Sequence, residues 1–97
     1  MIIEKGDMAV VRKHIYFSGR VQGVGFRYRA CCIAQSLGLT GWVKNLWDGR
    51  VEMEVQGTRH DIGCLLEQLH RQPFIEIEDM DIDEIPCVKE SDFREVY

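Results

Sequence analysis

Strand-like and helix-like stretches alternate in one order along this chain, and that order constrains its fold more than any other feature of the sequence. A β-branched and aromatic run over residues 14–18 indicates a first strand. Apolar residues then recur at helical spacing over residues 26–37, which predicts a helix. Two further strand-like runs, 41–47 and 50–55, are separated by Asp48-Gly49, which predicts an antiparallel pair joined by a two-residue hairpin.

The second half of the chain predicts one helix and one strand. Thr58 suits a helix N-cap and Asp61 follows three residues later, ahead of four apolar residues at helical spacing, Ile62, Leu65, Leu66 and Leu69. The apolar alternation over 75–77 is out of phase with that over 80–82. This shift predicts a β-bulge or a late strand start near Asp79.

The resulting order, β-α-β-β-α-β, predicts an α+β fold of the ferredoxin-like sandwich type. Right-handed crossovers would place one antiparallel sheet under two helices on the same face, with residues 93–97 as an added edge strand. We expect residues 1–11 to form a loose N-terminal extension and residues 12–97 to form one domain, because 97 residues bury too little surface for two cores. This fold serves many functions and does not identify one.

Composition narrows the class of protein. No apolar run approaches the roughly 20 residues that span a bilayer, and the first seven residues carry two acidic side chains, so we expect a cytoplasmic protein with no membrane partner. Cys31 and Cys32 are adjacent, and neither forms a C-x-x-C pair with Cys64 or Cys87. This spacing provides no metal clip and favours four reduced thiols, although a disulfide scaffold is the alternative. We also expect a monomer.

Charge is divided unevenly along the chain. Residues 12–50 hold seven basic and one acidic side chain, whereas residues 51–97 hold four basic and thirteen acidic ones. The basic half could attract a small anion, or these charges could simply cover solvated faces. Because the later strands are rich in Asp and Glu, a sheet that binds RNA is disfavoured, and we expect no nucleic-acid partner.

The loop over residues 19–27 is the first candidate site. Gly19, Gly23 and Gly25 would let successive backbone N–H groups turn inward, and the helix that starts there adds unpaired donors and a positive dipole end. Arg27 stands in the first helical turn, where an acidic residue would normally be favoured, which suggests a bound anion beside it. The alternative is a glycine-rich turn with a solvated arginine.

Asn45 is the second candidate. Asn is poorly suited to a strand, yet it lies in a strand-like run, so its amide could have a function such as holding a water molecule. A position just before a turn would explain it equally well. Whether Asn45 reaches Arg27 depends on the strand register.

These two segments, Gly19-x-Val21-Gln22-Gly23-Val24-x-Phe26-Arg27 and Gly41-Trp42-Val43-Lys44-Asn45-x-x-x-Gly49-x-Val51, resemble the two signature stretches of the acylphosphatases. The resemblance covers residues 12–97. It implies hydrolysis of the carboxyl–phosphate bond of acyl phosphates to a carboxylate and inorganic phosphate, with no metal and no cofactor. A related alternative is a non-catalytic module that binds carbamoyl phosphate or another anion, as found inside larger proteins.

The resemblance also implies roles for individual residues. Arg27 would bind the phosphoryl oxygens and Asn45 would orient the attacking water, while backbone amides would complete the phosphate site at Gln22, Gly23, Val24, Gly25 and Phe26. Neither 19–27 nor 41–45 contains His, Asp or Glu, so His14, His60 and His70 are interpreted as surface residues of strands and helices. Phe17 stands where the family usually has an aliphatic residue, and Glu95 stands where its last strand tends to be apolar.

Overall fold

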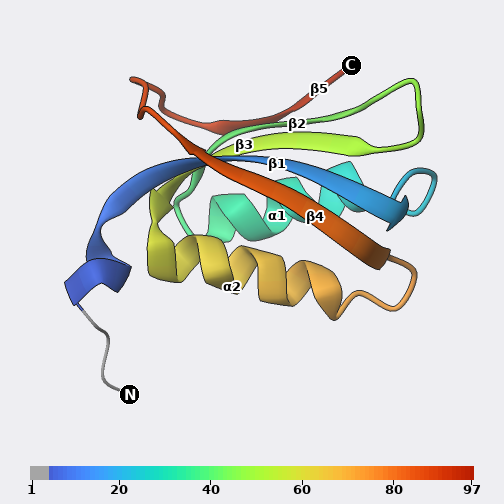
Figure 1. Cartoon of the computed structure of the whole chain (residues 1–97), viewed down its shortest axis with the longest axis horizontal. Coiled ribbons are helices and arrows are strands. Elements are labelled where there is room, and N and C mark those ends of the chain that lie inside the picture. Colours follow the sequence, from blue (N-terminus) through green and yellow to red (C-terminus); the bar gives the residue numbers. More distant parts are fainter. Residues whose placement is uncertain (1–4) are drawn as a thin grey trace.

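The computed structural model describes residues 5–97, and residues 1–4 of the predicted extension lie outside the described residues (Figure 1). A 3-10 turn, Lys5–Met8, precedes five strands and two helices. In chain order these are β1 (Val10–Arg20), α1 (Phe26–Ser36), β2 (Thr40–Asn45), β3 (Val51–Thr58), α2 (Arg59–His70), β4 (Glu76–Ile85) and β5 (Phe93–Val96). The first strand therefore begins at Val10, inside the segment that was expected to be an extension.

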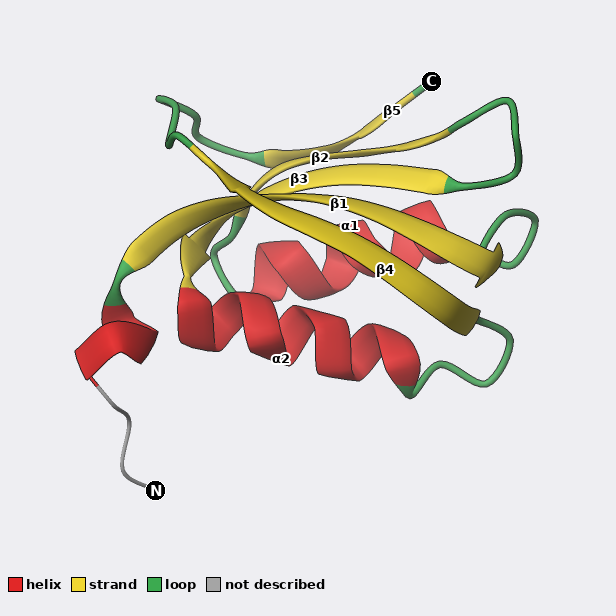
Figure 2. Ribbon diagram, viewed as in Figure 1, coloured by secondary structure: helices red, strands yellow, loops and turns green. Residues whose placement is uncertain are grey.

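The strands form one sheet in the order β4-β1-β3-β2-β5, and both helices cover the same face of it (Figure 2). This arrangement confirms the ferredoxin-like α+β fold. The prediction of a fully antiparallel sheet is wrong at one edge, because β5 pairs parallel with β2. Strand β4 is antiparallel to β1, so it ends at the same end of the sheet at which β2 begins. The chain then crosses to the far edge, and β5 starts there beside the beginning of β2 and runs parallel to it.

The core lies between the sheet and the helices. Ile15 and Phe17 of β1 and the alternate residues Val51, Met53 and Val55 of β3 point toward the helices and are fully buried, which is the pattern of a sheet with one covered face. Phe17 of β1 packs against Phe26 of α1 with ring centroids 4.9 Å apart, so the core accommodates the aromatic side chain at this position. Burial of these apolar side chains is the main force that holds the two layers together.

The predicted β-bulge is confirmed. Ser18 pairs with Asp79 but the next residue, Gly19, pairs with Ile77, so Glu78 is the extra residue of β4. Gly19 has a φ of 124°, and a Cβ there would lie 2.2 Å from the carbonyl oxygen of Glu76. Only glycine allows β4 to come this close, so the bulge explains why glycine ends the first strand-like run.

The helix ends also follow the sequence. The Thr58 hydroxyl accepts a hydrogen bond of 3.1 Å from the backbone N–H of Asp61, which confirms the predicted N-cap of α2. Helix α1 has no such cap: Gly25 precedes it in the left-handed conformation, and no side chain bonds to its first amides. The first turn of α1 therefore presents backbone donors to the loop in front of it. Neither α1 nor α2 is long and apolar enough to cross a membrane.

Candidate active site

A cavity of about 230 Å³ opens where the loop before α1 meets the ends of β2 and β5. Arg27 and Asn45 both line it, which answers the question that the sequence left open. They come from different elements: Arg27 from the first turn of α1 and Asn45 from the last position of β2. The other lining residues are Val21, Gly23, Gly25, Phe26, Tyr28 and Glu95.

The loop presents unused backbone donors. Gly23 and Gly25 have φ values of 74° and 78°, in the left-handed region that only glycine adopts readily. Within the part of the chain that the structure describes, no hydrogen bond uses the backbone N–H groups of residues 22–28, whereas the next amide, that of Arg29, bonds to the carbonyl of Gly25 at 3.0 Å. A run of free amides at a helix start is suited to binding an anion.

Arg27 is positioned by the last strand. Its Nη1 donates a hydrogen bond of 3.5 Å to the carbonyl oxygen of Val96, and its guanidinium lies 4.4 Å from the centroid of the Tyr97 ring. Among residues 5–97 it forms no ion pair with a carboxylate. The positive charge at the cavity wall is therefore available to a ligand, and a guanidinium can bind two phosphate oxygens at once.

The hairpin that holds Asn45 differs from the prediction. Strand β2 ends at Asn45 and its partner Val51 begins β3, so the connection is longer than the two residues predicted. The backbone N–H of Leu46 bonds to the carbonyl of Arg50 at 2.8 Å, which closes a three-residue turn with Gly49 at a φ of 93°. Three-residue hairpins of this kind need glycine at their left-handed position. Trp47 lies in this turn and is 98% exposed.

Gln22 and Val24 were predicted site residues that do not line the cavity. The Gln22 side chain reaches across to the hairpin, where its Nε2 donates to the carbonyl oxygens of Leu46 at 2.6 Å and Arg50 at 2.9 Å. Gln22 thus ties the loop before α1 to the strand end that carries Asn45. Sequence reasoning missed this contact because the two segments are more than 20 residues apart and no periodicity relates them.

Glu95 is a lining residue that sequence reasoning did not include in the site. The sequence marked it only as an acidic residue in an apolar strand position. It lies on β5 beside Val43 of β2, so it shares the helix-facing side of the sheet with Asn45. Burial, the charge of Glu95 and the neighbouring Cys32 together raise the pKa of the Cys31 thiol on α1 to about 11.

All four cysteines are free.

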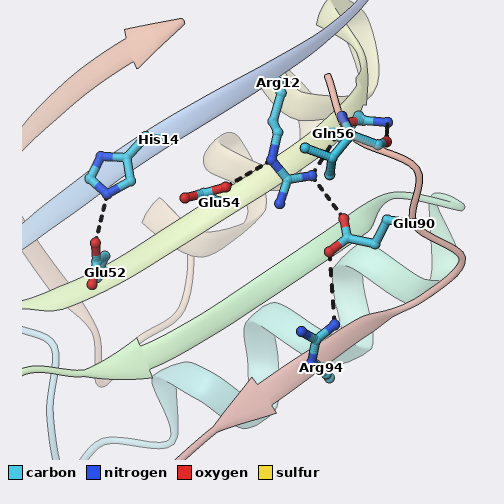
Figure 3. A network of polar contacts seen from close by, with 8 residues as sticks. Arg12, His14, Glu52, Glu54, Gln56, Glu90 and Arg94 are labelled. Carbon is cyan, nitrogen blue, oxygen red and sulfur yellow. Dashed lines mark hydrogen bonds and ion pairs between the residues drawn. The ribbon is translucent and has the colours of Figure 1, made fainter. Parts of the chain in front are cut away.

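The histidines lie outside the cavity, as the sequence indicated. His14 projects from the open face of the sheet and its Nε2 lies 2.7 Å from Glu52 (Figure 3). His60 and His70 contact their own helix, through the Cys64 sulfur and the Leu66 carbonyl. Figure 3 also shows Arg12 within an ion-pair network on this open face, away from the cavity.

A family model described as acylphosphatase matches residues 13–95 of the chain. An acylphosphatase from Bifidobacterium longum is 43% identical over 83 residues, an alignment that covers 84% of this chain and 86% of that protein. One from Methanothrix thermoacetophila is 41% identical over 81 residues, covering 82% of this chain and 90% of the other.

Solved structures agree with these sequence matches. An acylphosphatase from Coxiella burnetii superposes with a TM-score of 0.83 at 37% identity, over 97% of this chain and 100% of that one. One from Bacillus subtilis superposes with a TM-score of 0.82 at 35% identity, over 92% and 100%. A HypF structure matches with a TM-score of 0.79 at 28% identity, over 92% of this chain and 12% of HypF. Because the family model matches residues 13–95 and relatives more than 40% identical align over most of both chains, this chain belongs to the acylphosphatase family.

Proposed function

We propose that this acylphosphatase hydrolyses acyl phosphates in the cavity between the loop over residues 19–27 and the end of β2. The observation that carries the proposal is that Arg27 and Asn45 line one cavity together with a loop of unused backbone donors. In the proposed complex, Arg27 and the amides of residues 22–26 bind the phosphoryl oxygens. Asn45 binds the attacking water through its side-chain amide.

The chemistry suits these few groups. Water attacks phosphorus in line with the bond to the acyl oxygen, that bond breaks, and the products are a carboxylate and inorganic phosphate. Since the carboxylate is a good leaving group, the protein mainly positions the water and stabilises charge on the three equatorial oxygens. Arg27 and the loop amides supply that charge stabilisation, and Asn45 supplies the position of the nucleophile.

Hydrolysis of benzoyl phosphate tests these roles. Wild type, Arg27→Ala and Asn45→Ala are compared for phosphate release, with circular dichroism to show that each variant is folded. We expect Arg27→Ala to lose both activity and phosphate affinity, and Asn45→Ala to lose turnover while phosphate still inhibits. Full turnover by either folded variant would refute the role given to that residue.

The finer properties of the protein are also proposals. We propose that the reaction needs no metal, because the loop amides and Arg27 provide the positive field that a cation would otherwise supply; activity that survives dialysis against a chelator is the expected result. We propose a cytoplasmic monomer, as expected from the size and composition of the chain. Sedimentation at micromolar concentration and cell fractionation test these two points.

A second candidate is a non-catalytic module that binds carbamoyl phosphate. The match to a HypF structure supports this candidate, because the matched region is 12% of HypF and that protein was solved in a phosphate-bound form. Binding of carbamoyl phosphate without release of inorganic phosphate, from carbamoyl or benzoyl phosphate, would support the module over the enzyme.

A further inference from the structure

Two side chains that carry charge line the proposed phosphate cavity, Arg27 and Glu95. The remaining lining residues are glycine, apolar, tyrosine and the neutral amide of Asn45. The positive side chain that would attract a phosphate is therefore opposed, within the same cavity, by a negative one.

The register between β5 and β2 turns the Glu95 side chain toward the cavity. In the parallel pairing of β5 with β2, Glu95 is beside Val43, and Asn45 lies two residues further along β2 on the same face. That face is turned toward α1, whose first turn holds Arg27. The half-buried Glu95 thus lies between the strand that provides Asn45 and the helix that provides Arg27.

Within the described residues Glu95 forms no ion pair, either with Arg27 or with any other basic side chain. Its charge also reaches the inner side of α1, where it is one cause, after burial, of the raised pKa of the Cys31 thiol. A ligand in the cavity is exposed to the same field.

We propose that Glu95 is a specificity-determining residue whose carboxylate lowers the affinity of the cavity for doubly charged tetrahedral anions relative to singly charged ones. This inference rests on the proposed function, since it requires that the cavity bind phosphate. Coulomb repulsion scales with the charge of the ligand, so a dianion loses twice the binding free energy that a monoanion loses. One consequence is weak retention of product phosphate, which is largely doubly charged at neutral pH, together with weaker binding of the acyl phosphate, whose phosphoryl group carries the same double charge.

The size of the effect follows from distance and screening. A unit charge on the wall of a small cavity that is open to solvent changes the affinity for a monoanion by roughly threefold at about 0.1 M salt. The corresponding change for a dianion is the square of that factor, roughly tenfold. A structural disturbance of the cavity would not follow this relation between the two ligands.

Calorimetric titration with sulfate and with perchlorate tests the proposal, since both are tetrahedral and keep a fixed charge across neutral pH. The proteins are wild type, Glu95→Gln, Glu95→Leu, Arg27→Ala and the control Glu67→Gln, all at one ionic strength. Glu67 is an exposed residue of α2 that does not line the cavity, so its replacement makes the same change of net charge and breaks only an exposed ion pair with Arg71. Melting temperatures confirm that each variant is folded.

We expect both Glu95 variants to bind sulfate about tenfold and perchlorate about threefold more tightly than wild type. Glu67→Gln should match wild type. Equal sulfate affinity in wild type and both Glu95 variants, with binding abolished by Arg27→Ala, would overturn the role of Glu95 and leave the phosphate site intact. If folded wild type and both folded Glu95 variants bind no sulfate, the phosphate site itself is wrong, and this proposal fails with it.

Discussion

The contact between Gln22 and the β2–β3 hairpin predicts that one isosteric change will damage catalysis with little effect on the core. The Gln22 Nε2 donates to the carbonyls of Leu46 and Arg50, one on each side of the turn. Glutamate has the same shape but no hydrogen to donate when it is ionised, so Gln22→Glu replaces two hydrogen bonds with an oxygen that faces two carbonyl oxygens.

The expected loss can be worked out from these two bonds. A typical hydrogen bond contributes about 0.5–1.5 kcal/mol, and the repulsion between the new glutamate oxygen and the two carbonyl oxygens adds to the cost. A total of about 2–3 kcal/mol weakens the docking of the loop on the hairpin. Because the loop amides and Asn45 must be held at a set distance for the reaction, we expect kcat/KM to fall by roughly 30- to 160-fold.

The assay is steady-state hydrolysis of benzoyl phosphate, together with urea unfolding. Gln22→Met, which also lacks donors but carries no charge, separates lost bonds from added repulsion. Gln72→Glu is the matched control, because Gln72 also donates to a carbonyl, that of Gln68, at 3.2 Å but at the end of α2. If Gln22→Glu and Gln22→Met both keep the kcat/KM of wild type, the loop does not need this contact and the reasoning is wrong.

Three further predictions concern other parts of the molecule. Arg12 is 2% exposed and pairs with Glu54 and Glu90, each at 2.8 Å, on the face of the sheet opposite the cavity (Figure 3). Arg12→Met should therefore lower the free energy of unfolding in urea by about 2–3 kcal/mol, while activity persists. Gly25→Ala forces alanine to a φ of 78° and should cost about 1–2 kcal/mol of stability and weaken sulfate binding, whereas Gly63→Ala, inside α2 with open space around it, should stabilise the protein by about 0.5–1 kcal/mol. Burial is the chief cause that raises the pKa of the Cys31 thiol from 9.0 to about 11, so on raising the pH the unfolded chain loses this proton before the folded protein does. The free energy of unfolding should therefore fall by about 1–2 kcal/mol between pH 9 and 11, after allowing for solvent screening. That decrease should be absent from Cys31→Ala, and a decrease of the same size in both proteins would contradict the assignment.

Much of the fold could be predicted because patterns among neighbouring residues determine the helices, the strands and their ends. The bulge near Asp79 appeared in the sequence as a change of apolar phase, and the Thr58 cap as a hydroxyl placed before a helical repeat. Each depends on residues within a few positions of one another, which is the range over which backbone periodicity and capping act. The prediction of a two-residue hairpin was wrong although it also rested on neighbouring residues, since Asp48-Gly49 suits more than one turn length.

The candidate site divides in a similar way. Arg27 and the glycines could be identified because a helix start and a flexible loop are local features. The side-chain contact of Gln22 and the place of Glu95 in the cavity were missed, since each depends on a partner elsewhere in the chain. A carbonyl acceptor on the hairpin and a neighbouring strand across the sheet have no local signature.

The amino-acid sequence by itself determined the order of the elements, the side of each that is buried, and the two segments that resemble the family signatures. Tertiary structure alone decided that β5 enters parallel beside β2, that Gln22 joins loop to hairpin, and that a carboxylate shares the cavity with Arg27. The physical reason is that apolar spacing acts along the chain, whereas strand order and charge proximity are decided only when distant segments pack together.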